Sequence, residues 1–183
     1  KPIYLDEKSK GKVVEICDLK IGLPKKPKVG TLGTKKSKKN QKWERTPLPE
    51  NWDVIPTKDK ESFVAREFKR REEGVWFMNN GTPTYITGAH YYYLNWCKID
   101  IGYPDYRDRD RRFFVFWDAC VKDDMSFGMQ MIKHRREGAS WKGACLALYY
   151  ASSNFNAHAG LLSKTGTDAK DLFFKVVDLF RSL

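Results

Sequence analysis

The feature that most constrains the fold is a segment in which an apolar run meets a short basic turn and then a helix-compatible run. Residues 127–133 are mostly apolar, residues 134–140 include Gly138 and Ser140 beside two arginines, and residues 141–152 have a helical composition. This order predicts a strand, a turn and a helix. In that geometry, backbone N–H groups and a helix N-terminus can hold phosphate. We therefore expect a phosphate-binding turn within residues 133–140.

A second segment of the same kind follows. Residues 159–163 are typical of a short buried strand, and residues 164–168 of a turn into a last helix. We expect Thr167 or Asp168 to cap this helix. Its predicted core face consists of Leu172, Phe173, Val176, Val177 and Phe180.

Strand, turn and helix, repeated once, predict a parallel sheet with covered faces. The expected class is therefore α/β, with a P-loop NTPase-type parallel sheet core of which only the first βαβα part is present. Two core strands do not make a stable sheet. We therefore expect the sequence to be the N-terminal part of a longer protein.

The chain before this core predicts several further elements. Thr57 is a candidate N-cap for a helix over residues 58–73, which Gly74 would end. The segments 75–78 and 84–87 flank an Asn-Asn-Gly turn and predict a β-hairpin. The aromatic residues within 88–99 indicate a buried helix, and the apolar spacing over 113–121 indicates an amphipathic one. Two histidines, His90 and His158, have no acidic residue or cysteine at the spacing of metal or catalytic partners. We therefore expect them to lie in the core or on the surface without a catalytic role.

Charge divides the chain at about residue 56. Residues 1–50 hold 14 Lys and Arg against 6 Asp and Glu, and residues 25–42 contain no acidic residue. We expect residues 1–56 to form a basic, Lys- and Pro-rich flexible arm and linker, and residues 57–183 to form the N-terminal part of a P-loop ATPase domain. The arm either contacts a polyanion such as nucleic acid or serves as a solubilising tail. The lysines expected to contact nucleic acid are Lys25, Lys26, Lys28, Lys35, Lys36, Lys38 and Lys39.

The four cysteines are scattered without metal-ligand spacing, which argues against a zinc site and a disulfide framework. No run of about 18 apolar residues is present, and the N-terminus lacks an apolar signal core. These observations predict an intracellular location rather than secretion.

The basic turn matches the phosphate-loop pattern G-x-x-x-x-G-K-[ST] only in part. Gly138 and Ser140 fit, but Lys133 replaces the first glycine and Ala139 replaces the lysine. The lysine of that pattern supplies a cation to the phosphates, and Arg135 or Arg136 could supply it instead. The alternative is an ordinary strand-to-helix turn with exposed arginines.

Five segments together resemble the N-terminal ATPase region of the large terminase subunit of tailed bacteriophages. They are WFMNNGTPTYITGAH (76–90), YPDYR (103–107), RRFFVFWD (111–118), KHRREGAS (133–140) and GLLSKTG (160–166). The resemblance covers roughly the last 110 residues. It implies a motor that uses ATP to drive double-stranded DNA into the prohead, in the cytoplasm of an infected bacterial cell. It also implies the portal protein and the small terminase subunit as partners, and a homo-oligomeric ring for the full-length protein.

The resemblance further implies roles for the turn. Arg135, or Arg136, would replace the catalytic lysine, and Ser140 would bind Mg²⁺. The nucleotide would contact Arg135, Arg136, Glu137, Gly138, Ala139 and Ser140. The helix at 113–121 and its preceding loop would lie near the adenine.

The sequence also departs from that family. No apolar strand ending in Asp-Glu follows Ser140, and no acidic nuclease domain is present, so this part alone is expected not to hydrolyse ATP efficiently. The rival hypothesis is a non-catalytic basic nucleic-acid-binding or virion-assembly module with a degenerate phosphate loop. A third is a helicase-like ATPase.

Overall fold

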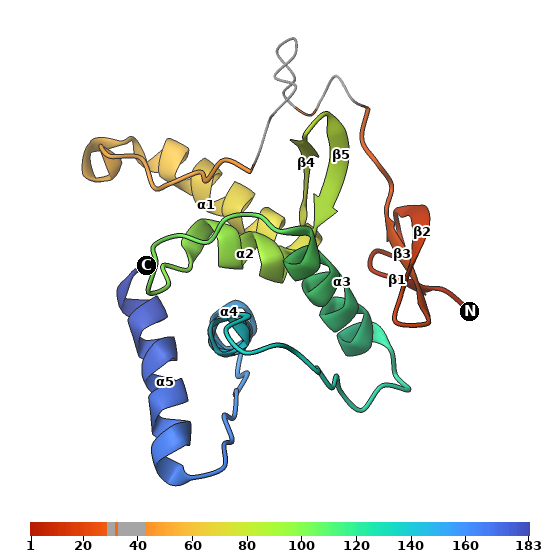
Figure 1. The fold of residues 1–183 in the computed structure, drawn as a ribbon. Coiled ribbons are helices and arrows are strands. Elements are labelled where there is room, and N and C mark those ends of the chain that lie inside the picture. The colour runs from red at the N-terminus through yellow and green to blue at the C-terminus, as the bar shows by residue number, and fades with distance from the viewer. Residues whose placement is uncertain (29–31, 33–42) are drawn as a thin grey trace.

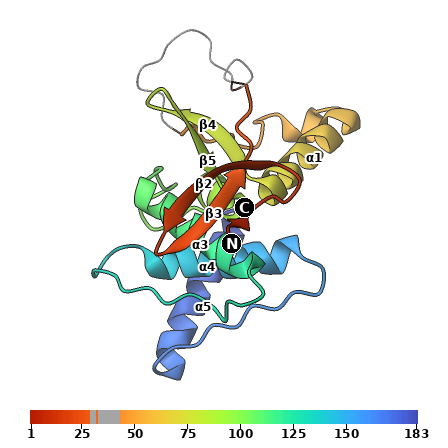
Figure 2. The same cartoon turned by 90° about the vertical axis from the view of Figure 1, so that its right-hand side faces the viewer.

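The computed structural model describes residues 1–28, 32 and 43–183, and shows a mixed α/β protein (Figure 1). In these residues five α-helices accompany one three-stranded and one two-stranded sheet. The two sheets lie on one side of the molecule, and the last two helices lie on the other (Figures 1 and 2). No helix in this part of the chain is long and apolar enough to cross a membrane.

The N-terminal residues form a sheet where the sequence predicted a flexible arm. β1 (Ile3–Tyr4) pairs in parallel with β3 (Leu19–Pro24), which pairs antiparallel with β2 (Lys10–Ile16). Cys17 and Asp18 join β2 to β3, with φ of 48° and 65°. Two left-handed residues in a two-residue loop suit the twist of a hairpin. The prediction was wrong here because Cys-Asp is not one of the residue pairs that usually mark such a turn.

This sheet packs on the third helix, so residues 3–24 belong to the folded body. Ile21 and Leu23 of β3 are buried in one cluster with Val115 and Ala119 of α3 (Asp108–Lys122). The Lys122 ammonium also donates a hydrogen bond to the carbonyl of Leu5. Burial of these apolar side chains is what holds the N-terminal sheet in place.

The elements predicted between residues 57 and 122 are confirmed. α1 (Thr57–Glu73) ends at Gly74, whose φ is 74°, although Pro56 rather than Thr57 occupies the N-cap. β4 (Val75–Asn79) and β5 (Thr82–Ile86) form the antiparallel hairpin, turning at Asn80 and Gly81. A short 3₁₀-helix, η2 (Trp52–Val54), precedes α1.

α2 (Gly88–Trp96) is the centre of the main core. Its first turn is capped by Thr87, whose hydroxyl accepts a hydrogen bond from the His90 N–H at 3.4 Å. The side chains of Tyr91 and Tyr92 are fully buried, so the tyrosine run packs in the core as expected. α1, α3 and α4 (Ala139–Ser153) all contact α2.

The two predicted core strands are absent from the described structure. Residues 127–133 and 159–163 form no strand and have no ladder partner, so this part of the chain contains no parallel βαβα sheet. Several of their large apolar side chains are solvent-exposed, among them Phe127, Ile132 and Leu162. A short apolar run indicates a strand only if another strand lies beside it, and none does here.

The last helix, α5 (Gly166–Arg181), packs on α4 but not through the expected face. Leu179 is fully buried and Val176 packs on the core, whereas Phe173 and Phe180 are 55% and 65% exposed. The cap is Thr165, which accepts a hydrogen bond from the Asp168 N–H, rather than Thr167 or Asp168. The face of α5 that packs on the core is therefore not the predicted one: it contains Leu179 and Val176, and the two phenylalanines lie outside it.

Candidate functional site

The turn before α4 has a backbone suited to binding an anion. Arg136 and Gly138 both adopt left-handed conformations, with φ of 68° and 69°. α4 begins at Ala139, and its N-cap residue Gly138 provides no side-chain hydrogen bond. The first N–H groups of a helix have no partner within the helix, and here no side chain replaces one. These N–H groups and the helix dipole favour negative charge at this end of α4.

The side chains of the turn add positive charge. Lys133, His134, Arg135 and Arg136 are all exposed, and so is Ser140 in the first turn of α4. Among the described residues, no carboxylate lies within ion-pair distance of Arg135 or Arg136. The residues predicted to bind phosphate thus lie together on one exposed turn.

Consecutive residues of α3 hold this turn in place through two ion pairs. Arg109 Nη1 lies 3.1 Å from Glu137 Oε1, and Asp110 Oδ1 lies 2.7 Å from Lys142 Nζ. The first pair is on the surface, with 53% of the Arg109 side chain exposed. A surface pair contributes little to stability. It nevertheless places a carboxylate within the turn, beside two unpaired arginines.

The second pair is buried. Lys142 and Asp110 are 2% and 5% exposed, and the Lys142 ammonium also lies 5.1 Å from the centre of the Phe113 ring. Removing one partner would leave an uncompensated charge in the interior, which is strongly destabilising. The pair therefore fixes the first turn of α4 against the first turn of α3.

Sequence reasoning missed both partners of this pair. The sequence pattern led to no role for either Lys142 or Asp110. The sequence did contain a signal of a buried lysine. Lys142 precedes Gly143 and the apolar run Ala-Cys-Leu-Ala-Leu, so it belongs to an otherwise apolar helical segment. A lysine in such a segment requires a buried acidic partner.

The helix expected to lie near the adenine, α3, reaches the turn through its own first turn, where Arg109 pairs with Glu137. A surface pocket of about 320 Å³ lies at the other end of α3, where Trp117 and Val121 face Phe127 and Met129. A 15-residue helix is about 22 Å long, so this pocket is far from Glu137 along the helix. The structure thus brings the start of α3, and not its aromatic half, to the turn.

The basic segment is described only in part. Lys25, Lys26 and Lys28 are exposed beyond the end of β3. Lys35, Lys36, Lys38 and Lys39 lie outside the described residues.

The residues predicted to bind phosphate suit an anion better than they suit a metal ion. Free helix N–H groups and two exposed arginines are donors for phosphate oxygens. For Mg²⁺ the turn offers the Ser140 hydroxyl, and no group of three His, Cys, Asp or Glu side chains suited to a metal occurs in the described ranges. A P-loop hydroxyl binds Mg²⁺ together with nucleotide phosphates, so Ser140 fits that limited role.

The histidines occupy the expected core and surface positions. His90 is fully buried and stacks on Phe114, with ring centres 4.8 Å apart. Burial, together with the charges of Arg111 and Lys142, lowers the pKa of His90 to about 3. His158 is exposed. The four cysteines are free thiols, and all but Cys17 are buried.

Comparison with known proteins identifies no relative. No protein-family model matches the sequence, and no curated protein or solved structure matches it either.

Proposed function

We propose that this chain is part of a viral DNA-packaging motor in which ATP binds at the turn 134–140. The observation that carries the proposal is the uncapped N-terminus of α4, preceded by two left-handed residues and by exposed, unpaired arginines. Backbone N–H groups, a helix dipole and guanidinium groups at one place are the components of a nucleotide phosphate site. We propose a DNA-packaging motor rather than another ATP-binding protein because five segments resemble large terminase subunits.

In this proposal five residues of the turn have roles. Arg135 contacts the β- and γ-phosphates in place of the usual lysine, with Arg136 beside it. Gly138 lets the backbone approach the phosphates, and the N–H groups of Ala139 and Ser140 donate to them. The Ser140 hydroxyl binds Mg²⁺, which neutralises phosphate charge.

The proposed fold is a P-loop core in which residues 127–133 and 159–163, which form no strand in the described structure, become the strands before α4 and α5 when further strands pair with them. Two observations support this order. Each segment leads directly into one of two helices that pack on each other, and each exposes large apolar side chains that neighbouring strands would cover. The proposed partners are double-stranded DNA, the portal protein, the small terminase subunit and further copies of the chain in a ring.

Nucleotide affinity of an Arg135→Ala variant tests the proposal. A hydrogen bond to a charged group contributes about 1.5–3 kcal/mol, so we expect affinity for a fluorescent ATP analogue with Mg²⁺ to fall about 10- to 100-fold. Lys58→Ala is the control, because Lys58 is an exposed cation on α1 without a role in the turn. Equal affinity of wild type and Arg135→Ala would refute the role of Arg135.

One observation favours the alternative, a non-catalytic basic nucleic-acid-binding or virion-assembly module. The turn carries Ala139 at the lysine position and a carboxylate, Glu137, paired with Arg109. Such a module would bind DNA with a steep salt dependence and would be indifferent to MgATP. DNA binding measured with and without MgATP over a salt series distinguishes the two.

A further inference from the structure

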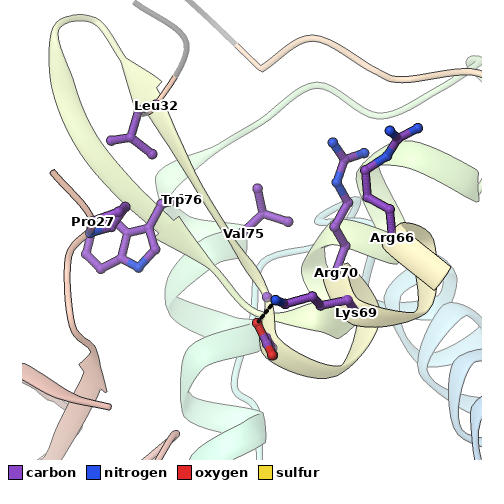
Figure 3. Close-up of a pocket in the computed structure, with 9 residues that line it drawn as sticks. Pro27, Leu32, Arg66, Lys69, Arg70, Val75 and Trp76 are labelled. Carbon is purple, nitrogen blue, oxygen red and sulfur yellow. Dashed lines mark ion pairs between the residues drawn. The ribbon is translucent and has the colours of Figure 1, made fainter. Parts of the chain in front are cut away.

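A second basic site, formed by elements other than the turn, lies between α1 and the β4–β5 hairpin. A pocket of about 280 Å³ opens there to solvent. Its apolar wall is formed by Val75 and Trp76 of β4 with Pro27 and Leu32 of the segment that follows β3 (Figure 3). Its rim is formed by α1, which contributes three cations, Arg66, Lys69 and Arg70, and one carboxylate, Glu73. Pockets for whole small molecules usually enclose about 300–1,000 Å³. This one is therefore suited to a small part of a larger ligand.

The cations of the rim lie on one face of α1. Arg66, Lys69 and Arg70 are spaced by three and four residues, which places them side by side on a helix. Arg66 and Arg70 project in the same direction, whereas Lys69 turns toward Glu73, 3.9 Å away (Figure 3). In the described part of the chain no carboxylate lies within ion-pair distance of Arg66, whose guanidinium instead lies 5.3 Å from the Phe63 ring centre.

Arg70 is held in a fixed position by a buried network. Its Nη1 donates to Glu67 Oε1 at 2.9 Å and to the Tyr91 hydroxyl at 3.3 Å. Glu67 is 4% exposed and also accepts hydrogen bonds from Tyr91 and from the Trp96 indole. Among the described residues, no hydrogen-bond partner of Arg70 Nη2 or Nε is found. Arg70 therefore presents preorganised donors that need little ordering on binding.

The chain around the pocket adds charge of the same sign. The exposed residues Lys25 and Lys26 precede Pro27 directly. Leu32 lines this pocket, and Trp43 packs on the core with its ring centre 5.4 Å from that of Phe77. Residues 33–42, which lie outside the described part of the structure, contain five lysines and no carboxylate in the sequence. A long run of cations without acids suits a repeating polyanion better than a single anion.

We propose that the pocket between α1 and β4 binds a backbone phosphate of nucleic acid. Arg66 and Arg70 donate to the phosphate, Lys69 adds charge, and the apolar wall of Val75 and Trp76 contacts the attached sugar. Such contacts fix the position of a duplex without reading its sequence. The proposal rests on the proposed function only for its choice of double-stranded DNA as ligand, and it is independent of the turn at 134–140.

The test measures binding of a fluorescently labelled 20-base-pair duplex to Arg66→Ala/Lys69→Ala, by anisotropy without nucleotide. Both side chains are exposed, so the fold should be retained, which circular dichroism checks. Each lost phosphate contact should lower the slope of log affinity against log salt by about 0.9. We expect the slope to fall by about 1 and the affinity at low salt to fall at least about tenfold.

The matched control is Lys164→Ala/Lys170→Ala, which removes the same charge from exposed residues near the start of α5. α5 lies away from α1 in both views of the fold (Figures 1 and 2). An equal loss in both double variants would overturn the proposal. So would displacement of the duplex by polyglutamate of matched charge as effectively as by unlabelled DNA, which would indicate an acidic peptide ligand.

A further variant separates this proposal from the proposed function. Arg135→Ala should lose less duplex affinity than Arg66→Ala/Lys69→Ala if the α1 pocket holds DNA, whether or not the turn binds ATP. Loss of duplex binding in Arg135→Ala with none in Arg66→Ala/Lys69→Ala would place the DNA contact at the turn and overturn the pocket.

Discussion

Lys142 Nζ lies 2.7 Å from Asp110 Oδ1, and both side chains are buried. This contact joins α4, which follows the basic turn, to the first turn of α3. The neighbouring Arg109–Glu137 pair joins the same helix to the turn itself. The candidate phosphate site is thus positioned by a helix some thirty residues earlier in the sequence.

Asp110→Ala should destabilise the protein by about 3–5 kcal/mol, because it leaves the Lys142 ammonium buried without a counter-charge. Asp110→Ala/Lys142→Met should recover much of that loss, because neither charge then remains. Urea unfolding of both variants measures the difference. A loss of under about 1 kcal/mol for Asp110→Ala would mean that the pair is solvated and does not anchor α4.

Two glycines with opposite surroundings offer a matched test of the packing. A Cβ on Gly88 would lie 1.7 Å from the carbonyl oxygen of Arg71, whereas nothing lies within 4 Å of a Cβ on Gly143. Gly88→Ala should therefore force α1 and α2 apart and cost about 3 kcal/mol or more, beyond usual overpacking. Gly143→Ala, within α4, should stabilise by about 0.5–1 kcal/mol. Thermal unfolding of the two variants should shift in opposite directions, and a shift in the same direction would contradict this packing.

Glu137→Gln should strengthen binding of ATP at the turn. The substitution removes a negative charge next to the proposed phosphate position and releases Arg109 from its ion pair. One carboxylate near a surface charge changes affinity by about 1 kcal/mol, or roughly fivefold. Titration with a fluorescent ATP analogue measures this change. Weaker binding by Glu137→Gln would show that the carboxylate supports the site rather than opposing it.

Local sequence signals predicted the middle of the fold well. Asn80-Gly81 between apolar runs marked the hairpin, and apolar spacing marked α1 and α3, because these signals act through neighbours in the chain. The Cys17-Asp18 turn carried no such signal, and the N-terminal sheet was missed with it. The segments 127–133 and 159–163 were assigned as strands from apolarity alone, which does not supply a pairing partner.

In the candidate site, as in the fold, the features that depend on local sequence could be predicted and those that depend on packing could not. Gly138 was expected at the turn, and its left-handed conformation is one that glycine adopts without strain. The ion pairs from Arg109 and Asp110 were not predictable, because they depend on how α3 packs against α4. The same holds for Arg70, whose position depends on a buried glutamate and on residues of α2.

Acid should destabilise the protein through His90. Its pKa is lowered from 6.5 to about 3 in the fold, so between these values the unfolded state binds more protons than the folded state. The free energy of unfolding should therefore fall as pH drops below about 6.5, by up to about 1.4 kcal/mol per pH unit. Nothing is lost above that pH, because the imidazole is then neutral in both states.

His90→Leu isolates this effect. Asp118, whose pKa burial raises to about 6, gives a slope of opposite sign, but it is present in both proteins and cancels in the difference. The stability of His90→Leu relative to wild type, from urea unfolding at pH 7.5, 6 and 5, should rise as pH falls. A difference that stays constant over this range would contradict the neutral, buried state of His90.

The central claim is that the turn before α4 binds the phosphates of ATP, and an NMR titration of backbone amides tests it most directly. With MgATP, the account predicts the largest ¹⁵N and ¹H shift changes at the amides of Gly138, Ala139, Ser140 and Trp141, and little change with adenosine. Shift changes confined to other residues, or none at millimolar MgATP, would contradict it.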